Sequence, residues 1–148
     1  MDRVKKLRIA VLFGGRSGEH DVSLMSARSV LAVLDPEKYE VTQVGITLDG
    51  EWLNGVETLE AFSQGNFEKL NRVVLPSEPS HSALYILKPG DLGEMMEKLA
   101  DVDVFFPVLH GPFGEDGTIP VSYTHLHSLR WIFKTMALKF TSDIIRAT

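Results

Sequence analysis

Hydrophobic residues follow one another almost without interruption in two short parts of the chain. Residues 7–13 (LRIAVLF) and 102–110 (VDVFFPVLH) are apolar at nearly every position. Runs of this length and density are typical of strands buried on both faces of a parallel sheet. Residues 39–47 (YEVTQVGIT) are rich in β-branched side chains and predict a further strand.

A helix is predicted between the first of these strands and the third. From Asp21 onward, apolar residues recur at helical spacing as far as Leu34, and the Asp-Pro pair at 35–36 ends the pattern. Asp21 is the predicted N-cap. A strand–helix–strand order implies a right-handed crossover and an α/β fold, so we expect an open, mostly parallel sheet flanked by helices.

The remaining segments are patterned more weakly. Residues 48–53 (LDGEWL) contain an Asp-Gly turn signal and predict a small hairpin. Short strands are predicted at 73–75 and at 83–87. A short helix is predicted at 92–100 (LGEMMEKLA). Beyond residue 120 the character changes, and apolar residues at helical spacing predict an amphipathic helix (Leu129, Phe133, Met136 and Phe140). We therefore divide the chain into a domain, 1–120, and a divergent tail, 121–148.

Charge and composition narrow the function. The net charge of −5 argues against nucleic acid and against an anionic membrane surface as partners. The absence of cysteine excludes disulfides and thiolate zinc sites and fits a reducing compartment. We recognise no signal peptide and no run near the ~20 apolar residues of a membrane span. The sequence therefore predicts a soluble, cytoplasmic protein.

A glycine-rich turn with acidic residues joins the first strand to the helix (LFGGRSGEHDVSL, 12–24). Turns of this kind usually bind phosphate, but a dinucleotide fingerprint would need glycine at Phe13, and a P-loop would need lysine at Glu19. A carboxylate a few ångströms from a phosphate repels it by a few kcal/mol at an effective dielectric constant of ~20. Glu19 therefore suits a cation better, and an ammonium group is the obvious small-molecule candidate.

A second turn, LHGPFGEDGT, follows the strand at 102–110. In a parallel sheet both turns leave the carboxyl edge, where ligands of α/β sheets bind, so His110 lies near Glu19 if the two strands are neighbours. Purely structural roles remain open for these residues. Gly14 and Gly15 can be required by a positive φ and by close packing. Glu19 can interact with the helix dipole, and His110 can be a structural hydrogen-bonding group.

Two acidic residues of the second turn, Glu115 and Asp116, could ligate a metal. Loop capping is the interpretation that we favour for both of them, and we expect no metal site in this chain.

Together, VLFGGRSGEHDVSLMSA (11–27) and FFPVLHGPFGEDGTI (105–119) resemble the N-terminal domain of the D-alanine–D-alanine ligases, members of the ATP-grasp superfamily. The resemblance covers residues 7 to about 119. It implies a Rossmann-like α/β domain that precedes the ATP-grasp domains. It also implies the activity of the family, an ATP- and magnesium-dependent ligase that activates one D-alanine as an acyl phosphate, which the amine of a second D-alanine attacks. The product serves peptidoglycan synthesis, and thereby cell-wall biogenesis and cell shape.

The same resemblance implies roles for individual residues. Glu19 falls on the glutamate that holds the ammonium of the first D-alanine and counts as catalytic. His110 lines the same pocket, and Val22 and Ser23 border it. The glycines Gly14 and Gly15 bring the chain close to the ligand.

The likeness ends after residue 119, where PVSYTHLHSLRWIFK replaces the helix and glycine-rich strand of the family. We expect a truncation, frameshift or chimeric junction there. In the family, the central and C-terminal domains bind ATP and Mg²⁺, so we expect neither to bind this chain and the chain alone to be inactive. The family also implies a homodimer. The alternatives are a D-Ala–D-lactate or D-Ala–D-Ser ligase, a non-catalytic α/β binding module, or an inert chain whose tail exposes its apolar face.

Overall fold

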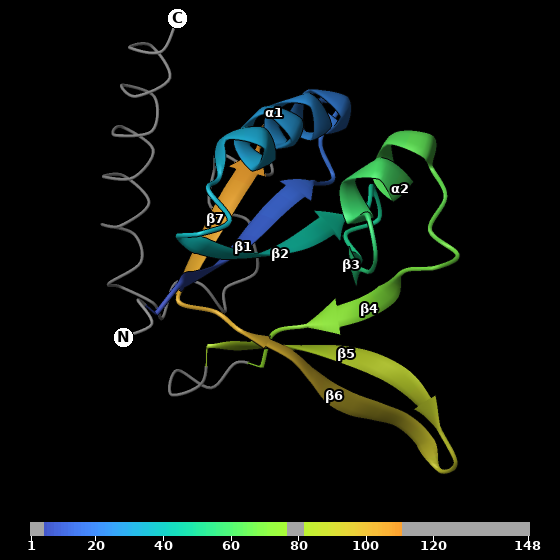
Figure 1. Cartoon of the computed structure of the whole chain (residues 1–148). Helices are drawn as coiled ribbons and strands as arrows, with labels where there is room; N and C mark the ends of the chain where they lie inside the picture. Colours follow the sequence, from blue (N-terminus) through green and yellow to red (C-terminus); the bar gives the residue numbers. More distant parts are fainter. Residues whose placement is uncertain (1–4, 77–81, 111–148) are drawn as a thin grey trace, which may run out of the picture.

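A single sheet with two helices forms the protein in a computed structural model that describes residues 5–76 and 82–110 (Figure 1). The elements follow in the order β1 (Leu7–Gly14), α1 (His20–Val33), β2 (Tyr39–Ile46), β3 (Trp52–Asn54), α2 (Thr58–Gln64), β4 (Asn71–Val74), β5 (Ala83–Gly90), β6 (Gly93–Asp101) and β7 (Val104–Leu109). The predictions of an α/β fold, of the strands at 7–13, 39–47 and 102–110 and of the first helix are confirmed.

The strand order among the described residues is β6-β5-β4-β3-β2-β1-β7. Strand β1 is parallel to both β2 and β7, whereas each pair from β2 to β6 is antiparallel. The sheet is therefore mixed, and the expectation that it is mostly parallel is wrong in this detail. Short connections such as the one between β2 and β3 cannot join parallel strands, which need a crossover of a dozen or more residues.

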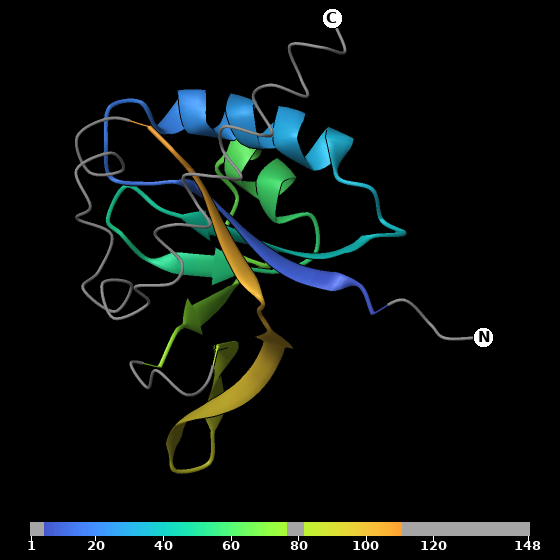
Figure 2. The same ribbon diagram turned by 90° about the vertical axis from the view of Figure 1, so that its left-hand side faces the viewer.

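Both helices cover the same face of the sheet, with α1 over β1 and β7 and α2 over β2 (Figures 1 and 2). The side chains of β1 alternate between two cores. Ile9, Val11 and Phe13 pack with residues of α1 and α2, and Ala10 and Leu12 pack on the opposite face. This burial on both sides explains why β1 is apolar at almost every position.

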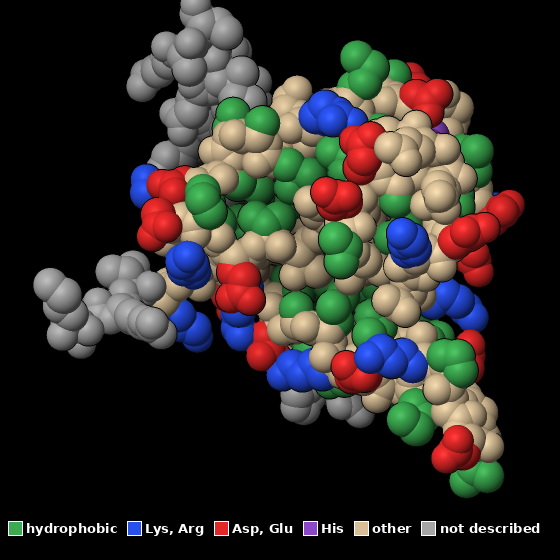
Figure 3. Space-filling view, turned by 45° about the vertical axis from the view of Figure 1, so that its right-hand side comes forward, with side chains coloured by type: hydrophobic (Ala, Val, Ile, Leu, Met, Phe, Trp, Pro, Cys, Tyr) green, Lys and Arg blue, Asp and Glu red, His purple; other side chains and the backbone are tan. Residues whose placement is uncertain are grey.

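One sequence prediction is wrong in kind: residues 92–100 form most of strand β6, not a helix. Gly90 pairs with Gly93, so the chain reverses within two residues and returns along β5. Backbone pairing with β5 overrides the helix propensity of the Glu-Met-Met-Glu-Lys-Leu-Ala stretch. The resulting hairpin projects from the sheet and exposes apolar side chains near its tip, among them Met95 and Met96 (Figure 3).

Smaller corrections concern the helices. The N-cap of α1 is Glu19, and the predicted cap Asp21 lies in the first turn. Helix α2 is not predicted from the sequence. The hairpin between β2 and β3 and the short strands β4 and β5 agree with the predictions. The predicted tail helix lies outside the described residues, as do the division at residue 120 and the turn residues Glu115 and Asp116. Within residues 5–76 and 82–110, neither helix is both long and apolar enough to cross a bilayer.

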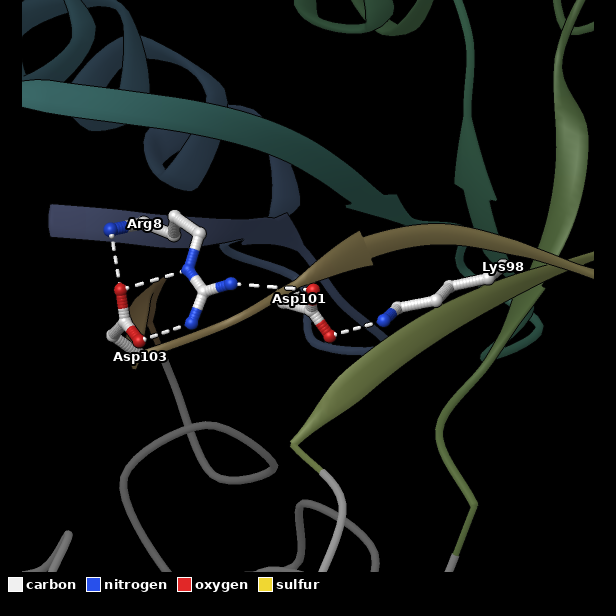
Figure 4. A network of polar contacts seen from close by, with 4 residues as sticks. All are labelled: Arg8, Lys98, Asp101 and Asp103. Carbon is white, nitrogen blue, oxygen red and sulfur yellow. Dashed lines mark hydrogen bonds and ion pairs between the residues drawn. The ribbon is translucent and has the colours of Figure 1, made fainter. Parts of the chain in front are cut away.

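An ion-pair network joins the amino end of β1 to the connection between β6 and β7 (Figure 4). The Nε and Nη2 atoms of Arg8 donate to the carboxylate of Asp103 at 2.9 and 2.6 Å, and Nη1 lies 3.2 Å from Asp101, which also pairs with Lys98. Because the Arg8 side chain and then its backbone N–H donate to Asp103, the pKa of that carboxyl lies well below its usual range. The network fixes β7 beside β1 at the edge opposite the glycine-rich turn.

Candidate functional site

The glycine-rich turn and His110 meet at the carboxyl edge of the parallel part of the sheet. Strands β1 and β7 are neighbours and run in the same direction, with Gly14 opposite Leu109. The turn at residues 15–19 and His110 directly follow these two strand ends. The sequence predicted that His110 lies near Glu19 only if these two strands are neighbours. The strands are neighbours.

Both glycines at the end of β1 are required by the fold. Gly14 has a φ of +89°, and a Cβ atom there would lie 2.3 Å from the carbonyl oxygen of Ile46 at the end of β2. Gly15 has a φ of +98°, and its N–H donates to the same oxygen at 2.8 Å. Close approach to β2 and a positive φ thus account for Gly14, and the positive φ accounts for Gly15. Contact of either glycine with a substrate stays a prediction.

Ser23 ties the turn to both strands. It is fully buried, and its Oγ accepts a hydrogen bond from the N–H of Gly14 at 2.8 Å and donates to the carbonyl oxygen of Val108. The sequence placed Ser23 at the border of the site. The structure gives its hydroxyl two backbone partners, and so a role in holding β1, α1 and β7 together.

Ser17, which sequence reasoning missed, links the two halves of the site. Its Oγ donates to the carbonyl oxygen of His110 at 2.6 Å and accepts from the N–H of Glu19 at 3.1 Å. One buried hydroxyl therefore sets the spacing between the backbone at Glu19 and the backbone at His110. The signal was present in the sequence as a small hydroxyl residue within the glycine-rich turn.

The two histidines near the turn have different surroundings. His20 is partly buried, with Nδ1 2.8 Å from the carbonyl oxygen of Gly15 and its ring stacked on Phe62, so it braces the turn. His110 is half-buried, and its Nε2 lies 3.0 Å from the Oγ of Ser26 on α1. Of the two, His110 stands at the strand edge beside Glu19.

The carboxylate of Glu19 is the exposed acidic group of this edge. Glu19 is the N-cap of α1, yet its side chain makes no capping hydrogen bond, and within the described residues it forms no hydrogen bond or ion pair. Val22, in the first turn of α1, is 48% exposed beside it. Within the described residues, the site thus offers a carboxylate without a partner, an imidazole and an apolar side chain on a backbone fixed by two serines.

A metal site is not formed by the part of the chain that the structure describes. Within residues 5–76 and 82–110, no three histidine, aspartate or glutamate side chains gather closely enough to hold a metal ion.

Comparison with known proteins gives a family match over most of the chain. Residues 8–128 match a family model described as the D-ala D-ala ligase N-terminus. The D-alanine–D-alanine ligase of Natranaerobius thermophilus is 50% identical over 118 residues, which are 78% of this chain and 30% of that protein. The ligase of Rhodococcus jostii is 48% identical over 124 residues, covering 77% of this chain and 32% of that protein. This chain thus spans about a third of the length of the curated relatives.

Solved structures agree with the fold. The VanG D-Ala:D-Ser ligase of Enterococcus faecalis superimposes with a TM-score of 0.66 at 32% identity, covering 81% of this chain and 34% of that one. The D-alanine–D-alanine ligase of Coxiella burnetii gives a TM-score of 0.59 at 24% identity, covering 85% and 34%, a likeness that concerns the fold alone.

Proposed function

Because the chain belongs to the D-alanine–D-alanine ligase family, whose N-terminal region it matches, we propose that it binds the first D-alanine of an ATP-dependent ligation of two D-alanines. Glu19 receives the ammonium group, and His110 and Val22 line the same site. The sequence spans about a third of its relatives, so the ligation itself requires regions that have no counterpart among the described residues.

The observation that carries this proposal is the exposed carboxylate of Glu19, which has no partner among the described residues and lies at the ligand-binding edge of the sheet. Two opposite charges 4 Å apart attract each other by about 1 kcal/mol in bulk water and about 4 kcal/mol at an effective dielectric constant of 20. An exposed carboxylate that has no partner within residues 5–76 and 82–110 is available for this attraction. The serine-held backbone provides the fixed geometry that orientation of a small substrate needs.

Nucleotide and magnesium do not fit the described residues. The turn has the outline of a phosphate loop, but Glu19 stands where a phosphate would lie, and no cluster of acidic ligands is available within residues 5–76 and 82–110. We therefore derive no catalytic step through ATP or Mg²⁺ and assign to this part of the chain the binding and orientation of D-alanine. Because residues 5–76 and 82–110 offer no site that suits a nucleotide, we expect this part of the chain alone to be inactive as a ligase.

Further expectations follow from the family and belong to the same proposal. The ligase would act in peptidoglycan synthesis in the cytoplasm and would form a homodimer. The second substrate is open among D-alanine, D-serine and D-lactate; the chain is similar to D-alanine–D-alanine ligases and also to the VanG D-Ala:D-Ser ligase. The names of both kinds of ligase include D-alanine, so the proposed role of Glu19 is the same in either case.

The proposal is tested by titrating the chain with D-alanine and following backbone amide signals by NMR. We expect signals of Gly15, Glu19 and His110 to shift in a saturable way at millimolar ligand, and this response to be lost in Glu19→Gln with an otherwise unchanged spectrum. Asp21→Asn is the matched control, because Asp21 is an exposed acid in the same helical turn. An unchanged response in Glu19→Gln, an equal loss in Asp21→Asn, or no response in the wild type would contradict the proposal.

A further inference from the structure

The side chain of Ser26 contacts the ring of His110, and binding of an ammonium group at Glu19 does not require this contact. Its Oγ lies 3.0 Å from Nε2 of His110, across 84 residues of sequence. Ser26 is one helical turn beyond Ser23 on α1, and residues three apart lie on the same helix face. Ser23 donates to the carbonyl oxygen of Val108, two residues before His110, so the two serines contact the end of β7 in succession.

His110 is thereby held at two separate atoms. Ser17 donates to its carbonyl oxygen at 2.6 Å, which fixes the backbone, and Ser26 contacts the ring, which restricts rotation of the side chain. A backbone contact alone would leave the imidazole free to turn about its side-chain torsions. The second contact is the one that decides where each ring nitrogen lies.

A serine hydroxyl can both donate and accept, so Ser26 can bond to Nε2 in either tautomer of the neutral ring, and what the contact fixes is the orientation of the ring. The contacts of the His110 ring among the described residues use Nε2. Within those residues, Nδ1 is the ring nitrogen that remains available to a ligand.

We propose that Ser26 is a positioning residue, whose hydroxyl fixes the orientation of the His110 ring and so presents Nδ1 to the substrate bound at Glu19. The substrate part of this inference rests on the proposed function, whereas the Ser26–His110 contact does not. Ser26 itself touches no substrate in this scheme and acts through the imidazole.

A neighbouring serine shows the structural alternative and provides the control. Ser29 lies on the exposed side of α1, and its Oγ donates to the carbonyl oxygen of Met25 one turn earlier at 3.4 Å, a common local hydrogen bond of serine in helices. If Ser26 were only a tolerated polar residue of the helix, its removal would affect His110 no more than removal of Ser29.

The test measures the side-chain rotamers of His110 in the whole chain without D-alanine, from three-bond NMR couplings about χ1. These couplings report the ratio of the rotamer that contacts Ser26 to the other rotamers. We expect Ser26→Ala to change this ratio by about fivefold, the factor that one ordinary hydrogen bond supplies. Ser26→Thr, which keeps a hydroxyl, and Ser29→Ala should leave the ratio within about twofold of the wild type. Ser26→Cys, which keeps the size but bonds weakly, should resemble Ser26→Ala and serves if the alanine variant fails to fold.

Adding D-alanine separates this inference from the proposed function. We expect the ligand to shift the Nδ1 signal in the wild type, Ser26→Thr and Ser29→Ala, and to lose this effect in Ser26→Ala or Ser26→Cys. An unaltered rotamer ratio in both of those last variants, or an equal change in Ser29→Ala, overturns the positioning role. If the ratio depends on Ser26 but the Nδ1 signal does not respond to D-alanine, the link to the substrate is overturned and the Ser26–His110 contact stands.

Discussion

Substitution of Gly14 by alanine should destabilise the chain more than the same substitution at Gly65 or Gly18. The new Cβ would lie 2.3 Å from the Ile46 carbonyl oxygen, against 3.4 Å for the shortest ordinary contact, and 2.9 Å from the ring of His20. That oxygen also accepts the Gly15 N–H, so it cannot retreat without weakening a hydrogen bond. Overpacking of this kind costs ~1–3 kcal/mol, and a left-handed backbone costs a residue with a Cβ a further ~1–2 kcal/mol.

The net loss is smaller than this sum, because alanine also reduces the entropy of the unfolded chain by ~0.4–1 kcal/mol. We therefore expect Gly14→Ala to lower the free energy of unfolding by about 3 kcal/mol. Gly65, after α2, has a φ of +65°, but an added Cβ would meet no heavy atom within 4 Å, so Gly65→Ala should cost only about 1 kcal/mol. Gly18 has neither constraint, and Gly18→Ala should be neutral or slightly stabilising.

Urea unfolding followed by circular dichroism, with linear extrapolation to water, measures all three variants on one scale. The order Gly14→Ala, then Gly65→Ala, then Gly18→Ala separates steric overlap from backbone strain. A free energy for Gly14→Ala within about 0.5 kcal/mol of that for Gly65→Ala would refute the claim that contact with β2 requires glycine at the end of β1.

Three further changes test the packing and the ion pairs. Ser23→Ala leaves two buried backbone groups without a partner and should cost about 2–4 kcal/mol in urea unfolding, and a loss below about 1 kcal/mol would contradict its bridging role. Phe62→Ala should cost about 3–5 kcal/mol in the same assay, because the ring is 4% exposed in the core under both helices, and a loss typical of a surface position would be inconsistent with that burial. The Asp103 carboxyl, whose pKa is lowered by Arg8, stabilises the fold above the unfolded pKa of about 3.9, and this contribution disappears as the pH falls through the lower folded pKa. Asp103→Asn should therefore be less stable near neutral pH and lose less stability on acidification, whereas parallel pH profiles for the two proteins would argue against the pair.

The central strands could be predicted from the sequence because their consecutive residues are nearly all apolar, which indicates burial on both faces of the sheet. Strand β1 is apolar on both faces, and that density distinguishes it from a half-buried strand before any partner is known. The sequence could not predict that β1 and β7 are neighbours, which is what places His110 beside the turn. Their adjacency depends on pairing between segments about 95 residues apart.

Where the sequence misled, a distant partner decided the outcome. Residues 92–100 have helix-forming side chains, and only pairing with β5 makes them a strand. Ser17 and Ser26 look like ordinary small polar residues until their partner, His110, lies across the sheet edge. The sequence contains one indication of helix α2, the glycine Gly65 just past its end, which adopts the left-handed conformation typical of a helix terminus. The seven residues of α2 are too few to show a clear helical period of apolar side chains.

We propose that Glu19 recognises the ammonium group of D-alanine. Its most direct test compares the dissociation constants of D-alanine and D-lactate, which carries a hydroxyl in place of the ammonium, for the wild type and Glu19→Gln. We expect the wild type to prefer D-alanine by about tenfold or more, equivalent to about 1.4 kcal/mol, and Glu19→Gln to bind both within about twofold. A preference for D-alanine that survives in Glu19→Gln would contradict the account.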